Sequence, residues 1–215
     1  VFDNDQLINS KGIQNYNVGR NLSFTDFINL LIRPKEFFTS GINLQKKKYL
    51  NLLMWFVGFA AVYDRLNSNV QKEFYTSGNA GNYEFFMDSW WKVWLLLSLF
   101  GIISGAVTYL VGGFWYNLRL SFCGVKNQKE TGRTIFMYNK IFYSLSALIL
   151  LIIETLSFNT YRDSFYESAT LSTIMAFVSL FLLVWSIINS YRSVINVFEI
   201  KKIAATIWFL ILPLA

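Results

Sequence analysis

Long apolar runs separated by polar segments dominate the chain from residue 49 onward. The runs at 93–116, 135–156 and 169–190 are each long enough to cross a hydrocarbon core of about 30 Å as helices. Less regular apolar stretches at 49–66 and 200–215 complete the pattern. It predicts an all-α fold, a polytopic membrane helix bundle in which residues 49–215 form five transmembrane helices.

The last apolar stretch is short for a span. The thirteen residues from Ile203 to the end rise only about 20 Å as a helix. We therefore expect either an earlier helix start, with Lys201 and Lys202 reaching back to the interface, or a chain that is truncated.

The first 48 residues have a different pattern. Residues 1–22 are polar, rich in Asn and without a period, which indicates a flexible cytosolic tail. Residues 23–48 place apolar side chains on one helical face, and a proline begins a second short helix: Phe24, Phe27, Ile28, Leu31 and Pro34. Because neither helix is long enough to span, we expect amphipathic helices that lie at the membrane interface.

This basic, aromatic elbow contains the residues that we expect to contact lipid headgroups or a partner. Its cations suit the headgroup level, and its large apolar side chains suit the acyl boundary or the helix bundle. The residues are Leu31, Arg33, Pro34, Lys35, Phe37, Phe38, Lys46, Lys47 and Lys48, with Arg119 added from the segment after the second span.

Lys and Arg are divided unequally between the two predicted sides of the membrane. Of the 19 such residues, only Arg65, Lys72, Lys92 and Arg162 fall on the side opposite the N-terminus. This bias predicts a cytoplasmic N-terminus and an external C-terminus. The net charge of +6 on the cytoplasmic face favours anionic lipids as partners. The loops are too short to provide a nucleic-acid-binding scaffold.

Composition excludes several functional classes. The chain is 54% hydrophobic and 15% charged, which is typical of a membrane protein. It has no histidine, and Cys123 is its one cysteine, which excludes an internal disulfide, a Cys/His zinc site and His-assisted nucleophilic catalysis. Without a phosphate-binding glycine motif either, we expect no cofactor, no metal and no enzymatic activity.

Small residues recur along the second span at helical spacing, namely Gly101, Gly105, Thr108 and Gly112, followed by Gly113. Such a face allows another helix to approach closely. The neighbour is expected to be a helix of the same chain; a second copy or a partner helix is the alternative. The Gly112-Gly113 pair also allows the helix to bend.

Two polar residues inside predicted spans are candidates for a functional role. Glu154 is the one acidic residue of the span at 135–156, and an intramembrane carboxylate is a candidate for proton relay, cation coordination or partner binding. Its place near the outer end also allows an interfacial or internally hydrogen-bonded role. Asn189 is a weaker candidate, suited to an interhelical hydrogen bond.

The segments "LLIRPKEFF" and "YLVGGFWYNLRLSFCGVKNQKETGRTIFMYN" together resemble the Yip (Ypt-interacting protein) domain family. The matching positions are Leu31, Pro34, Phe38, Gly112, Gly113, Arg119, Gly124 and Tyr138. The resemblance implies five spans and a cytoplasmic N-terminus. The aspartate-leucine-tyrosine-glycine-proline motif of eukaryotic trafficking members is absent, so the chain is more similar to the prokaryotic branch, which implies a bacterial inner membrane.

The resemblance and the residues favour a non-enzymatic adaptor, scaffold or accessory subunit that binds partner proteins, a homo-oligomer or lipids. The alternative is a small transporter or lipid-handling protein that uses Glu154 and the Gly-rich second span. A membrane enzyme is a third hypothesis, for which the spans offer no recognisable acid–base pair.

Overall fold

The computed structural model describes residues 23–39, 47–167 and 169–214, which contain helices and no strand. The all-α prediction is confirmed for this part of the chain. The elements are α2 (Phe24–Ile32), α3 (Pro34–Thr39), α4 (Lys47–Ser77), η1 (Gly81–Tyr83), α5 (Glu84–Met87), α6 (Trp90–Val107), η2 (Thr108–Gly112), α7 (Gly113–Phe122), α8 (Lys129–Ser157), α9 (Tyr161–Glu167), α10 (Ala169–Val197), α11 (Lys202–Thr206), η3 (Ile207–Ile211) and α12 (Leu212–Leu214). The predicted tail at 1–22 and Lys46 lie outside the described residues, as do the side chains of Pro34, Lys35, Lys47 and Lys48.

Three helices are long and apolar enough to cross a membrane, as expected of a membrane protein. They are Trp90–Phe122, which combines α6, η2 and α7, then Lys129–Ser157 and Thr173–Val197. They overlap the spans predicted at 93–116, 135–156 and 169–190. With 33, 29 and 25 residues they are longer than the hydrocarbon core requires, because the helical backbone continues into the polar flanks.

The helix at the first predicted span extends further than expected. We predicted a polar loop after residue 66, but α4 continues to Ser77 and has 31 residues, a length of about 46 Å. The reason is a buried face at helical spacing, formed by Tyr63, Leu66 and Val70, which are 1%, 5% and 0% exposed. The last predicted span corresponds to a shorter apolar helix, Lys202–Leu214.

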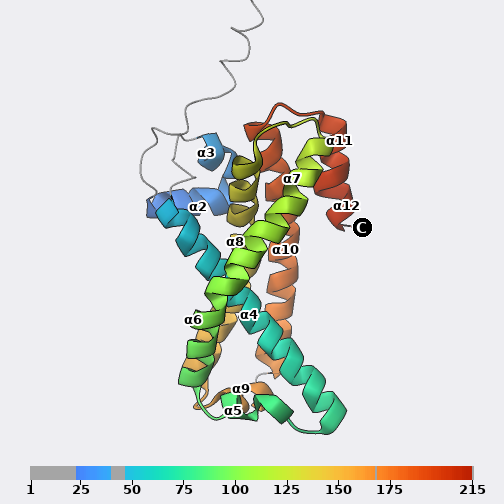
Figure 1. The fold of residues 1–215 in the computed structure, drawn as a ribbon. Helices are drawn as coiled ribbons and strands as arrows, with labels where there is room; N and C mark the ends of the chain where they lie inside the picture. Colours follow the sequence, from blue (N-terminus) through green and yellow to red (C-terminus); the bar gives the residue numbers. More distant parts are fainter. Residues whose placement is uncertain (1–22, 40–46, 168, 215) are drawn as a thin grey trace, which may run out of the picture.

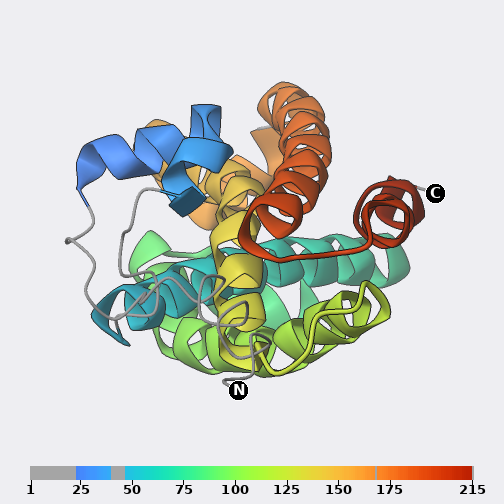
Figure 2. The same cartoon turned by 90° about the horizontal axis from the view of Figure 1, so that it is seen from above.

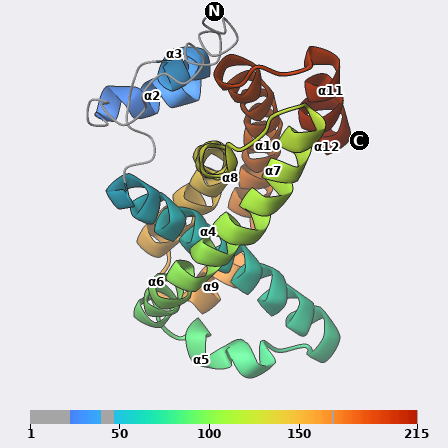
Figure 3. The same cartoon turned by 45° about the horizontal axis from the view of Figure 1, so that its top comes forward.

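Figure 1 shows α4 and the α6–α7 helix crossing as an X, with α8 and α10 behind them. The short helices α2, α3 and α11 lie at one end with the α7–α8 connection, whereas α5 and α9 lie at the other (Figures 1 and 3). We call these the basic end and the opposite end. Seen from above, the C-terminal helix lies beside α7 at the edge of the bundle (Figure 2), where the Phe122 and Trp208 rings stack at 4.7 Å.

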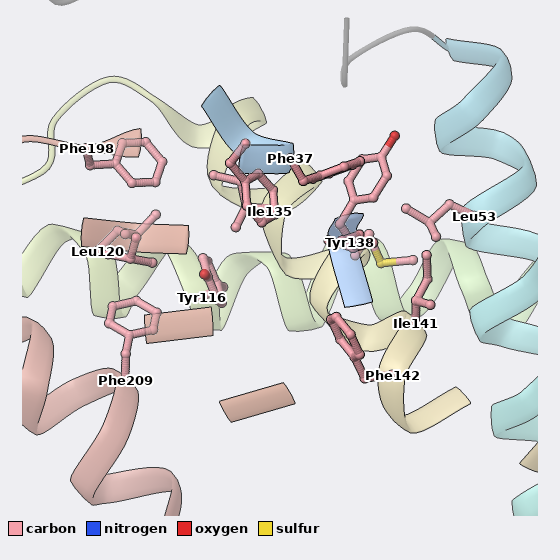
Figure 4. Packing of buried hydrophobic residues seen from close by; sticks show 14 of the residues in the cluster. Phe37, Leu53, Tyr116, Leu120, Ile135, Tyr138, Ile141, Phe142, Phe198 and Phe209 are labelled. Atoms are coloured by element: carbon pink, nitrogen blue, oxygen red, sulfur yellow. The ribbon is translucent and has the colours of Figure 1, made fainter. Parts of the chain in front are cut away.

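The described helices bury two clusters of apolar side chains. The cluster at the basic end joins the elbow to the bundle, because the Phe37 ring lies 5.4 Å from the Tyr138 ring (Figure 4). Within the same cluster, the rings of Tyr116 and Phe209 are 5.0 Å apart. The second cluster contains Trp90 at the start of α6. In hydrocarbon, such contacts stabilise by close packing rather than by removal of water.

Candidate functional site

Glu154 lies in the last turn of α8 and is only 3% exposed. The hydroxyl of Tyr63 in α4 donates a hydrogen bond to its carboxylate. The hydroxyl of Tyr161 in α9 donates to the side-chain oxygen of Asn67. Burial, assisted by the charge of Glu154, raises the pKa of Tyr161, so this hydroxyl remains a protonated donor. We call Tyr63, Asn67, Glu154 and Tyr161 the Glu154 cluster.

Further contacts hold the opposite end around this cluster. The Trp90 indole donates to the Phe158 carbonyl at 2.9 Å and thereby satisfies a carbonyl just past the end of α8. Arg162 pairs with Glu84 and, at 3.0 Å, with Asp88, which ties α9 to α5. These two carboxylates raise the pKa of Arg162. Glu154 is therefore an internal, hydrogen-bonded residue, and the elements around it are joined by further hydrogen bonds and ion pairs.

Gly101 and Gly105 form the crossing point of α6 with α4. A Cβ atom on Gly105 would lie 1.9 Å from the Met54 backbone oxygen, and one on Gly101 would lie 3.0 Å from Phe59 backbone atoms. On the facing helix, a Cβ on Gly58 would lie 2.0 Å from the Gly101 oxygen. The GxxxG face is thus occupied by a helix of the same chain.

The remaining small residues of this span contact a different helix. A Cβ on Gly112 would lie 2.4 Å from the Phe136 ring of α8, and one on Gly113 would lie 2.5 Å from the Arg133 side chain. Between the two contact regions, Thr108 begins the π-helical segment η2, which ends at Gly112. A π-helical turn takes more residues than an α-helical turn, so it rotates the following residues toward α8.

The elbow packs on α8 and α10, and an apolar groove lies beside it. Phe37 and Phe38 are 1% and 3% exposed, and the Trp185 indole donates to the Leu31 carbonyl at 2.9 Å. Arg33 is exposed and pairs with Glu36 at 3.5 Å. The groove has a volume of about 470 Å³ and lies between α2, α4 and α8; its residues include Phe27, Leu30, Leu52, Leu53, Phe56 and Ile141.

Arg119 lines a second hollow at the basic end, which we call the basic cavity. It has a volume of about 500 Å³ and lies between the α6–α7 helix, α8, α10 and the C-terminal helix. Lys140 of α8 is its second cation and lies 5.7 Å from the Phe136 ring centre. The hydroxyls of Ser190 and Tyr116 also line it, and Ser190 donates to Tyr116 at 3.1 Å.

Asn189 is fully buried between these elements, but its amide group forms no hydrogen bond within the described part of the chain. We predicted an interhelical hydrogen bond. Ser193, one turn further along α10, donates to the Asn189 carbonyl at 2.6 Å, and the interhelical hydrogen bond of this region joins the Asn139 amide to the Ser193 hydroxyl at 3.5 Å instead.

A third hollow, which we call the α4–α10 cavity, lies between α4, α8 and α10 and has a volume of about 400 Å³. Tyr63 of the Glu154 cluster lines it together with Asp64 and Ser179. Leu183 of α10 lines both this cavity and the basic cavity and is 40% exposed. The two hollows therefore share one apolar side chain of α10.

The sequence interpretation missed three residues of these sites, and two of them had a signal. Gly58 lies in an apolar run, where a small residue marks a close helix contact. Lys140 lies inside the predicted span 135–156, where a cation is rare. Tyr63 had no signal, because its bond to Glu154 joins residues 91 positions apart. Among the described residues, no group of three or more Asp, Glu or Cys side chains is placed to hold a metal ion.

Comparison of the chain with protein-family models, with curated proteins and with solved structures finds no match. The resemblance to the Yip domain family therefore stays a prediction that rests on the quoted segments.

Proposed function

We propose that the chain is an integral membrane adaptor, scaffold or accessory subunit that binds partner proteins or lipids and has no catalysis of its own. In this proposal the three long apolar helices, α4 and the C-terminal helix cross a bacterial inner membrane as five spans. The N-terminus is cytoplasmic, and the elbow lies on that leaflet as a pair of interfacial helices. The resemblance to the Yip domain family supports the same hypothesis of five spans and a cytoplasmic N-terminus.

The observation that carries the proposal is the apolar groove beside the elbow. Leu52 in its wall is 61% exposed. Ile32, which follows the groove residue Leu31 at the end of α2, is 64% exposed, and the exposed cation Arg33 comes next in the chain. An apolar groove that is followed by an exposed cation suits a helix of a membrane partner or an acyl chain below an anionic headgroup.

Photo-crosslinking in native membranes tests this proposal. A photoreactive residue at Ile32 or Leu52 is expected to capture one stoichiometric protein or lipid, because Leu52 lines the groove and Ile32 is the exposed residue after the groove residue Leu31. The matched control is the same residue at Leu156, which is 82% exposed at the opposite end and is expected to capture only bulk lipid. Equal labelling at all three positions, with isolation as a lone monomer that moves a solute, would contradict the adaptor function.

A lipid-handling function is the second candidate, favoured by the two hollows that share Leu183 as a lining residue. Leu183→Ser would place a polar group in the wall that both hollows share, so we expect faster transfer of a headgroup-labelled lipid between leaflets of reconstituted vesicles. Phe177→Ser is the control, since it introduces the same polar group on α10 at a position that is 71% exposed and lines neither hollow. Equal rates for both variants and the unmodified chain would exclude this function.

A further inference from the structure

The basic cavity contains two cations and no carboxylate. Arg119 and Lys140 both line it, and none of its lining residues is Asp or Glu. In the described part of the chain, no ion pair neutralises either residue. Two like charges that line one cavity of about 500 Å³ repel one another. A bound anion would remove this repulsion.

The depth of Lys140 makes an unpaired charge costly. It lies five residues inside the predicted span 135–156, or about 7–8 Å along the helix. Arg119 lies in the last turn of α7, closer to the end of its span. A cation at this depth is costly unless it faces the bundle interior and has a counter-charge. The cavity provides the first condition, and an anion that enters from the membrane surface would provide the second.

The rest of the lining suits a ligand with a polar head and an apolar tail. The hydroxyls of Tyr116 and Ser190 line the cavity with the two cations. Among its lining residues, Trp115 is apolar and 58% exposed. The π-helical segment η3 contributes Phe209 to the lining, and Ile207 and Ile211 of the same segment are 45% and 56% exposed. Acyl chains would lie along this apolar surface.

From this arrangement we propose that the basic cavity binds the phosphate of an anionic phospholipid, with Arg119 and Lys140 as its ligands. Guanidinium and ammonium groups bind phosphate oxygens through charge-assisted hydrogen bonds. Because the lining contains no carboxylate, the ammonium group of a zwitterionic lipid has no partner there. The cavity therefore selects a lipid with an anionic headgroup, such as phosphatidylglycerol. This inference rests on the proposed membrane-protein function and adds a ligand class and a site to it.

Native mass spectrometry of the full chain, with added phosphatidylglycerol or phosphatidylcholine, measures the selectivity directly. The unmodified chain is expected to retain phosphatidylglycerol more tightly, and Arg119→Gln with Lys140→Gln is expected to weaken that binding about tenfold or more, as loss of two charge-assisted contacts implies. The matched control, Lys201→Gln with Lys202→Gln, removes the same charge from exposed positions at the same end and should keep the selectivity.

A photoreactive phosphatidylglycerol provides a second measurement on the unmodified chain, in case the double variant does not fold. Adducts on the peptides that contain Trp115 to Arg119 or Phe136 to Lys140 support the site. Adducts confined to other segments overturn it, as does unchanged lipid retention by a folded double variant. Occupancy by inorganic phosphate alone, with no gain from the lipid, would show a free-anion site and overturn the lipid assignment.

The outcomes for the cavity and for the proposed function are separable. Crosslinks at Ile32 and Leu52 that persist while the cavity lacks lipid would contradict this inference and leave the adaptor function standing. Specific lipid binding at the cavity without any crosslink at Ile32 or Leu52 would support this inference and contradict the adaptor function.

Discussion

Gly105→Val is expected to prevent normal packing of α6 on α4 and to cost more than about 3 kcal/mol of folding stability. Overpacking by extra methyl groups typically costs about 1–3 kcal/mol when side chains move aside. Here the added Cβ would lie 1.9 Å from the Met54 backbone oxygen and 2.5 Å from its carbonyl carbon. Since backbone atoms cannot rotate away, the helices must separate. Thermal denaturation in detergent, followed by the fraction that stays monodisperse, measures the loss.

Two further variants of α6 provide a scale for the stability lost in Gly105→Val. Gly101→Ala is expected to cost less than Gly105→Val, because its Cβ would lie 3.0 Å from the nearest atoms of Phe59. Val107→Phe adds more volume on a side that is 52% exposed, so its stability should remain close to that of the unmodified chain. If Gly105→Val were as stable as Val107→Phe, the close crossing of α4 and α6 would be refuted.

The long apolar helices could be predicted from sequence because each has a continuous local signal. The run at 93–116 exceeds the length of a hydrocarbon core and lies within the observed helix Trp90–Phe122. The extension of α4 to Ser77 also had a local signal in Tyr63, Leu66 and Val70, but the run of polar residues at 67–69 gave the segment the composition of a loop. In that segment helical periodicity was more informative than mean hydropathy.

The contacts between helices could not be predicted in the same way. Gly101 and Gly105 indicated a close neighbour, but no local pattern identified α4 as that neighbour or Gly58 as the facing residue. The π-helical segment that turns Gly112 toward α8 has no sequence signature of its own. The basic cavity combines residues from four parts of the chain: Arg119 was expected to contact headgroups, but only the depth of Lys140 in its span indicated a second cation inside the bundle.

Loss of the Glu154 side chain is expected to destabilise the opposite end by about 2–4 kcal/mol. Glu154→Ala leaves a cavity and removes the acceptor of the buried Tyr63 hydroxyl. Tyr63→Phe, which removes the donor and keeps the ring, is expected to cost about 1–3 kcal/mol. If the two groups act as a pair, the double variant will cost less than the sum of the two single variants, by about 0.5–3 kcal/mol. Denaturant titration of the four proteins measures this coupling.

Glu154→Gln separates the structural role of this residue from an ionic one. The glutamine oxygen still accepts the Tyr63 hydrogen bond, so the variant should fold and keep its captured partner at Ile32 and Leu52 if the chain is an adaptor. Loss of a proton- or cation-dependent transport activity in a stable Glu154→Gln protein would instead favour the transporter function, since only the charge has been removed. Strictly additive effects of Tyr63→Phe and Glu154→Ala would contradict the pairing itself, and the structural role of Glu154 would then lie in its other contacts.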